Sequence, residues 1–219
     1  MKGPGLARTY SMSVVGIDGH LVDVETYAGV GLVAFTLVGL LDTSVREARD
    51  RVRAAFESCG LDVLDQRITV NLSPAGIPKS GSAFDLSIAA SVALATGLVS
   101  PAAFEDAVIV GELALDGSIQ PVRGVLPAVL AARSLGVRRV IVPTAVSRCL
   151  ILNTSLTSSR GPGAMRSRRH SMGGSAYAAR LRISVIRWRS TWRMFVGSRR
   201  RLRRWKLRPP VVITCFFWV

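Results

Sequence analysis

The stretch from Ser73 to Asp85 constrains the fold of this chain more than any other. It follows an apolar, β-branched run that predicts a strand at residues 68–72, and it leads into an apolar pattern of helical period. Two prolines and two glycines lie between, so the loop itself can be neither element. Ser82 and Asp85 have capping-box spacing, which predicts that the helix starts there. A shaped loop between a strand and a helix is where many α/β proteins place their chemistry.

Hydrophobic patterning divides residues 9–147 into strands and helices, with residues 1–8 as a loose leader. The clearest helix is expected at Ser44–Cys59, because Ser44 and Glu47 have capping-box spacing and Gly60 follows the last apolar position. Early strands, then strands alternating with helices, predict an α/β (α+β) domain. The expected strands are residues 11–16, 20–27, 33–40, 67–72, 107–115, 119–122 and 137–142, and the other expected helices are residues 83–96 and 124–135.

The arginines on the helix expected at residues 44–59 have two interpretations. Arg46, Arg49, Arg51 and Arg53 could touch nucleic acid, but they are interspersed with acidic residues. Intrahelical pairs on a solvated face are the more common outcome, and we expect that one.

The composition changes abruptly near Arg148. Residues 1–147 contain 12 Lys/Arg and 14 Asp/Glu, whereas residues 148–219 contain 17 Lys/Arg, no acidic residue and all four tryptophans. The net charge of +15 therefore comes from the tail alone. We expect the tail to be disordered or poorly packed, since no helix or strand period persists in it.

Three interpretations of residues 148–219 stay open. The tail could be out-of-frame sequence, in which no chemistry was selected. It could be a nucleic-acid-binding arm, because arginines neutralise phosphates and tryptophans stack on bases. It could also be a segment that lies on a membrane surface. An aggregation-prone end at Cys215–Val219 favours the first interpretation.

The cysteines and the apolar runs indicate in which cellular compartment the protein is expected. Cys59, Cys149 and Cys215 form no disulfide framework, which suits a reducing environment. We see no signal peptide, and the apolar run at residues 211–219 is shorter than the roughly 20 residues that span a bilayer. We therefore expect a cytoplasmic protein without a membrane partner.

Most catalytic constellations are poorly supported. A phosphate-binding loop needs Gly-x-x-x-x-Gly-Lys-Ser/Thr, but Ser82 stands where the lysine of that motif should be, so we expect no nucleotide site. The two histidines, His20 and His170, are isolated, which favours neither a metal site nor a Ser-His-Asp triad. A Ser–Lys hydrolase that uses Ser82 and Lys79 remains as an alternative, because a buried neutral lysine can act as a base.

Four motifs in series carry a family resemblance. They are residues 47–55 (Glu-Ala-Arg-Asp-Arg-Val-Arg-Ala-Ala), residues 67–75 (Arg-Ile-Thr-Val-Asn-Leu-Ser-Pro-Ala), residues 78–86 (Pro-Lys-Ser-Gly-Ser-Ala-Phe-Asp-Leu) and residues 110–117 (Val-Gly-Glu-Leu-Ala-Leu-Asp-Gly). Together they resemble the N-terminal domain of the magnesium-chelatase-like AAA+ ATPases of the YifB/ComM type. The family motif residues expected at the site are Pro78, Lys79, Gly81, Asp85, Gly111, Glu112 and Gly117.

The resemblance implies a fold similar to the proteolytic domain of Lon, without its chemistry. In the register of the Lon pattern, the nucleophilic serine falls on Ala83 and its partner lysine falls on Leu126. Alanine has no oxygen and leucine no nitrogen, so we expect no catalytic residues and no peptidase activity.

The resemblance also implies what a full-length family member would add. An AAA+ module with Walker motifs would supply ATP and magnesium binding and ring assembly, and ComM-type members are implicated in DNA processing. No Walker A sequence follows residue 147. We therefore expect a fragment that needs no cofactor and is not an enzyme by itself.

Overall fold

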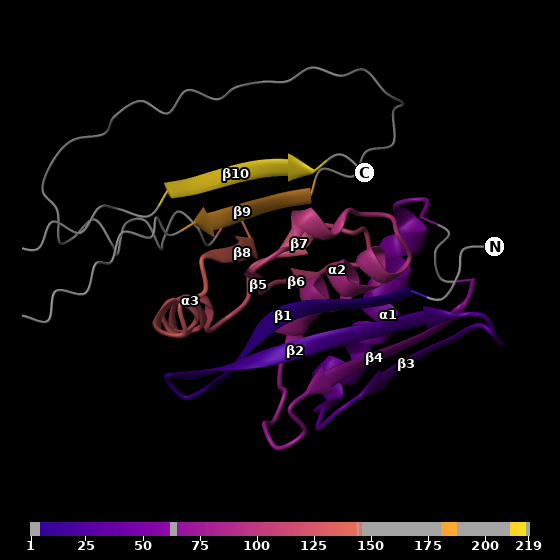
Figure 1. The fold of residues 1–219 in the computed structure, drawn as a ribbon, viewed down its shortest axis with the longest axis horizontal. Coiled ribbons are helices and arrows are strands. Elements are labelled where there is room, and N and C mark those ends of the chain that lie inside the picture. Colours follow the sequence, from indigo (N-terminus) through magenta and orange to yellow (C-terminus); the bar gives the residue numbers. More distant parts are fainter. Residues whose placement is uncertain (1–4, 62–64, 144, 146–180, 188–210, 218–219) are drawn as a thin grey trace, which may run out of the picture.

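The computed structural model describes residues 5–61, 65–143, 145, 181–187 and 211–217. Among them, eight strands form one sheet in the order β10-β9-β8-β5-β1-β2-β4-β3, and β6 and β7 form a separate pair (Figure 1). The expected mixed α/β fold is confirmed. The strands are β1 (Gly5–Val15), β2 (Asp18–Gly29), β3 (Ala34–Val38), β4 (Arg67–Ser73), β5 (Ala107–Ile109), β6 (Glu112–Leu113), β7 (Ile119–Gln120), β8 (Arg139–Pro143), β9 (Leu181–Arg187) and β10 (Val211–Phe217); the helices are α1 (Thr43–Ser58), α2 (Asp85–Ala95) and α3 (Val125–Ser134), with 3₁₀ turns at Ser82–Phe84 and Pro101–Ala103.

A long hairpin of β1 and β2 forms the centre of the sheet. The two strands pair antiparallel from Gly5 opposite Ala28 to Val15 opposite Asp18. The turn falls at Gly16, whose φ of 65° suits glycine, and β2 begins at Asp18, two residues before the strand that the sequence predicted at residues 20–27. The hairpin also begins at Gly5, so part of the expected leader belongs to the sheet.

Helices cover both faces of the sheet. α1 and α2 pack over β2 and β4 on one face, where Val24, Val70 and Ile88 are fully buried in the largest core cluster. α3 packs on the opposite face, where Ala128 and Ala132 meet Met12 in a second cluster. The alternation along β1 follows from these layers. On one face Thr9 donates to Ser87 of α2, Ser11 to Ile109 of β5 and Ser13 to Pro78 of the loop after β4, while Met12 on the other face packs in the cluster with α3.

The strand expected at residues 107–115 is broken at Gly111. β5 stays in the main sheet beside β1 and β8, whereas β6 turns away to pair with β7. Gly111 instead exchanges two backbone hydrogen bonds with the start of the α2 segment, its amide donating to Ala83 and its carbonyl accepting from Leu86, each at 3.0 Å. This break brings Glu112 and Leu113 to the helix-opening loop.

Neither expected capping box forms. The N-cap of α1 is Asp42, whose carboxylate accepts from the Val45 amide at 2.8 Å, rather than Ser44. α2 begins at Asp85 after the 3₁₀ turn and has no side-chain cap. The Ser82 and Asp85 side chains that the box needs are bonded elsewhere.

Two segments of the tail are described, and both are strands. β9 pairs antiparallel with β8, and β10 pairs antiparallel with β9, although no persistent strand period marks the tail in the sequence. The other residues of the tail lie outside the described part. No helix among the described residues is long and apolar enough to cross a membrane.

Candidate functional site

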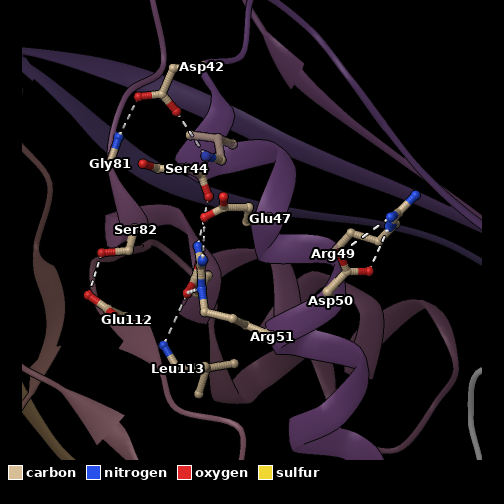
Figure 2. Close-up of polar contacts among 12 residues, drawn as sticks. Asp42, Ser44, Glu47, Arg49, Asp50, Arg51, Gly81, Ser82, Glu112 and Leu113 are labelled. Carbon is tan, nitrogen blue, oxygen red and sulfur yellow. Dashed lines mark hydrogen bonds and ion pairs between the residues drawn. The ribbon is translucent and has the colours of Figure 1, made fainter.

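The loop at residues 73–82 is fastened to the segment between β3 and α1. The Lys79 amide donates to the Leu40 carbonyl at 3.1 Å, and the Lys79 carbonyl accepts from the Asp42 amide at 3.0 Å. The Asp42 carboxylate also accepts from the Gly81 amide at 3.1 Å, so one side chain caps α1 and holds the loop. Figure 2 shows Asp42 between Gly81 and the first turn of the helix. Backbone and side-chain hydrogen bonds therefore both fix the loop to this segment.

Lys79 points into the interior of this loop. Its side chain is buried, with 1% exposed, and its Nζ donates to the Pro74 carbonyl within the same loop. Burial lowers the pKa of the Lys79 amine, because it disfavours the charged form. The Pro78 carbonyl accepts from the Ser13 hydroxyl of β1 at 2.7 Å, which attaches the loop to the sheet as well.

Ser82 is bonded to Glu112 and not to Lys79. Its hydroxyl donates to a carboxylate oxygen of Glu112, which comes from β6 (Figure 2). The Lys79 amine meanwhile donates to Pro74. The Ser–Lys pair that a hydrolase would need is therefore not assembled in this structure, and Ser82 does not serve as a helix cap either.

Asp85 and Arg51 form a buried ion pair between α2 and α1. The Arg51 Nε lies 2.6 Å from Asp85 Oδ2 and its Nη2 lies 3.0 Å from Oδ1, a bidentate arrangement. Arg51 also donates to the Ser44 carbonyl at 2.8 Å, and Asp85 accepts from the Leu113 amide at 3.3 Å. Burial raises the pKa of Asp85, and the facing guanidinium opposes that rise. The hydrogen bond to Asp85 raises the pKa of Arg51.

Arg51 and Asp42 are the two residues whose roles the sequence did not reveal. Arg51 was expected on a solvated face, yet its side chain is only 18% exposed. A signal was available: Asp85 is the only acid in a helix that is apolar nearly all round, and a buried carboxylate requires a cation. The exposed arginines do follow the expected pattern, since Arg49 pairs with Asp50 and Arg53 with Glu57.

Two of the three glycines of the family motif lie where a side chain would be crowded, whereas a Cβ at Gly81 would meet nothing within 4 Å. At Gly117 a Cβ would come within 2.6 Å of the Cys59 sulfur, and its φ of 80° also favours glycine. At Gly111 a Cβ would press on Leu86 at 3.1 Å. These motif positions support packing around the loop.

Ala83 and Leu126 occupy the positions that the Lon register predicted for a serine and a lysine. Ala83 lies in the 3₁₀ turn and packs against the cluster that contains Val125, the residue beside Leu126. Leu126 is 38% exposed in the first turn of α3. Neither side chain can accept or transfer a proton.

The neighbouring pocket is lined almost entirely by apolar side chains. A cavity of about 120 Å³ lies between α1, α2 and the β6–β7 pair, and its lining includes Phe56, Leu86 and Phe104. The Cys59 thiol is the only side chain in the lining with a reactive atom. Within the described residues, no three His, Cys, Asp or Glu side chains are grouped so that they could hold a metal ion.

The sheet, the fastened loop and the buried motif residues define a magnesium-chelatase-like α/β domain. The chain belongs to the family described as subunit ChlI of Mg-chelatase, whose model matches residues 24–146. The match ends where the composition changes.

Individual relatives agree with this assignment. The chain is 46% identical over 138 residues to an uncharacterized protein of Mycobacterium tuberculosis, covering 63% of this chain and 27% of that protein. It is 42% identical over 128 residues to the competence protein ComM of Haemophilus influenzae, covering 58% and 25%. It is 30% identical over 150 residues to the Lon protease of Mycolicibacterium smegmatis, covering 64% and 18%. The expected resemblances to ComM and to Lon are confirmed.

This chain spans about a quarter of the length of the first two relatives. The other three quarters of those two proteins lie outside the region that this chain matches.

Proposed function

We propose that this chain is a non-catalytic N-terminal domain of a ComM-type AAA+ protein, without the ATPase core. The observation that carries the proposal is the hydrogen bonding of the two reactive side chains. Lys79 donates to a carbonyl inside the loop, and Ser82 donates to Glu112. In a full-length relative, ATP, magnesium and ring contacts would belong to the part that this chain does not match. The domain would contribute contacts with substrate or with neighbouring subunits.

Two assays of the purified chain test the absence of catalysis. We expect no labelling by a serine-reactive fluorophosphonate probe and no ATP hydrolysis with magnesium present. The Ser82→Ala variant is the matched control, because it removes the hydroxyl of the alternative Ser–Lys hydrolase. Labelling of the wild type that disappears in Ser82→Ala would overturn the proposal and establish that hydrolase.

The assigned Lon register has its own test. In a Ser82→Ala background, Ala83→Ser combined with Leu126→Lys should restore a serine and a lysine at the expected positions, and we expect probe labelling at residue 83 by mass spectrometry. Ala83→Ser alone is the control and should label much less, because no base stands beside the hydroxyl. Equal labelling of the two variants would contradict the register.

A second candidate function, nucleic-acid binding, is favoured by the charge of residues 148–219. The relative ComM is named a competence protein, and 17 Lys/Arg without an acid suit a phosphate backbone. If the tail binds DNA, affinity for a duplex should fall about 10³-fold or more between 50 and 200 mM salt for six or more phosphate contacts. Deletion of residues 148–219 should abolish binding; undiminished binding by residues 1–147 would exclude the tail.

A further inference from the structure

The outer side of β8 is a sheet edge that a strand from the tail covers. β8 pairs with β5 on its inner side, and the described strand on its outer side is β9 (Figure 1). The family model matches residues 24–146, so it includes all of β8 and stops before β9. The edge therefore belongs to the family domain, whereas the strand that covers it does not.

The backbone groups of β8 that face β9 can be assigned from one hydrogen bond. The Ile141 carbonyl accepts from the Val110 amide at 3.0 Å, which directs the backbone groups of Ile141 to the side of β5. Because these groups alternate along a strand, those of Val140 and Val142 point outward to β9. Pro143 shares the direction of Ile141, so its missing amide does not block the outer side. The outer edge of β8 therefore offers unblocked donors and acceptors to an added strand.

One position of the pairing between β8 and β9 is mismatched. The register places Arg187 of β9 opposite Arg139 of β8, and like charges directly opposite one another weaken a strand pair. The Arg139 Nη2 donates to the Ala103 carbonyl at 2.7 Å, but its Nε is buried and has no hydrogen-bond partner among the described residues. A buried donor without an acceptor costs free energy, which a carboxylate on the neighbouring strand could recover. The tail cannot supply one, because residues 148–219 contain no acidic residue.

We propose that the outer edge of β8 is a docking site for an extended segment of another protein, which adds a strand antiparallel to β8 and places a carboxylate opposite Arg139. Backbone bonds to Val140 and Val142 would supply affinity, and the carboxylate would supply selectivity. The position opposite Arg139 is a non-hydrogen-bonded one, where opposed side chains come closest. β9 occupies the edge with the wrong charge at this position, so a better-matched strand displaces it. The inference does not depend on the proposed function, since it concerns a sheet edge and not the loop at residues 73–82.

Charge reversal within the full chain tests the preference for a carboxylate. Arg187→Glu should raise the hydrogen-exchange protection of the Val140 and Val142 amides by roughly threefold or more, because an opposite-charge pair replaces a like-charge pair. Arg182→Glu is the matched control. It changes the net charge equally, but it lies beyond Ile183, the last residue of β9 that pairs with β8. Equal changes in the two variants, or no change in either, would overturn the proposal.

Removal of the arginine on β8 tests whether it is the partner of the carboxylate. In an Arg139→Met background, Arg187→Glu should no longer raise the protection of the Val142 amide. The Ile141 amide, which faces β5, should stay protected in every variant and reports that the domain is folded. If it does not stay protected, Arg139→Gln replaces Arg139→Met. A gain from Arg187→Glu that persists without Arg139 would overturn the assigned selectivity.

A peptide tests docking by a separate segment. Full-length Ile186→Pro lacks the β9 amide that lies opposite Val140, so the edge of β8 should open. We expect a fluorescent peptide of residues 180–188 that carries Arg187→Glu to bind this variant, as measured by anisotropy. Its affinity should be roughly threefold or more above that of the same peptide with Arg182→Glu, which has equal charge. Equal affinities, or no binding of either peptide, would overturn the proposal.

Methylation of the peptide backbone tests the added strand. N-methylation at Ile186 should abolish binding of the peptide, because this amide faces β8, whereas N-methylation at Val185 should not, because that amide faces away. If Ile186→Pro reduces the protection of the Ile141 amide in the full chain, Ser184→Pro is the second variant, since Ser184 lies opposite Val142. Binding that both methylated peptides retain would show that no strand is added, and would overturn the proposal.

Discussion

Lys79 lies at the centre of the loop, and its burial has a consequence for stability. Lysine is rarely buried without a charged partner, and here the Nζ meets a backbone carbonyl instead. The folded chain therefore holds this amine in surroundings that favour the neutral form. The unfolded chain does not.

The lowered pKa of Lys79 predicts a pH-dependent stability. Between that pKa and the ordinary value of 10.5, the unfolded state binds one proton more than the folded state, so stability rises with pH. Lys79→Met removes this contribution. The unfolding free energy of the variant minus that of the wild type should therefore be largest at pH 7 and shrink toward pH 10.5, as measured by urea unfolding. Parallel pH profiles would contradict the prediction.

The Arg51–Asp85 pair predicts a large effect of a single substitution. Asp85→Ala would leave the Arg51 guanidinium largely buried without its carboxylate, which costs about 3–5 kcal/mol. Glu57→Ala is the control, because it breaks the exposed pair with Arg53, and such pairs contribute about 0–1 kcal/mol. Denaturant unfolding measures both. Similar losses in the two variants would show that the buried pair has no special role.

At the scale of the elements, the helices were more predictable than their caps. Apolar spacing located α1 within a residue of its observed ends. The cap depended on which of several neighbouring polar residues has extended backbone angles, and Asp42 has them, with φ −75° and ψ 178°. That choice follows from the bonds of Asp42 to Lys79 and Gly81, which are far away in the sequence. The break at Gly111 has the same origin, because its partners lie at the start of α2.

The shared role of Asp42 is testable at this scale. Asp42→Ala should destabilise the chain by about 1 kcal/mol or more, since it removes the cap of α1 and the acceptor of the Gly81 amide. Ser44→Ala, which alters the cap that the sequence suggested, should change stability by less than about half as much. Thermal unfolding distinguishes them. A larger loss from Ser44→Ala would contradict the observed cap.

At the scale of the whole molecule, the sequence predicted the fold class but not the order of the strands. Periodicity identifies strands one at a time, whereas their order depends on contacts such as that of Tyr10 with Val108. The family motifs likewise identified the loop. The hydrogen-bond partners of its side chains became known only from the structure. Ser82 could be assigned to a cap or to Lys79 from sequence; its partner Glu112 required knowledge of the turn at β6.

The change of composition near residue 147 leads to a whole-molecule prediction. All three described α-helices and six strands of the main sheet precede residue 147. A chain of residues 1–147 should therefore keep its helical circular dichroism and unfold cooperatively within a few degrees of the full chain, although its net charge changes from +15 to −2. Loss of the cooperative transition would mean that β9 is required on the edge of β8.

The central position of β1 also determines the order in which the chain can assemble. One side of β1 pairs with β2 within the same hairpin and can form early. Its other side pairs in parallel with β5, about a hundred residues later in the chain. A ribosome would therefore release most of the domain before that side of β1 is paired, and non-local pairing of this kind slows folding. Among the described strands, β1 therefore comes first along the chain and yet is among the last to be paired on both sides.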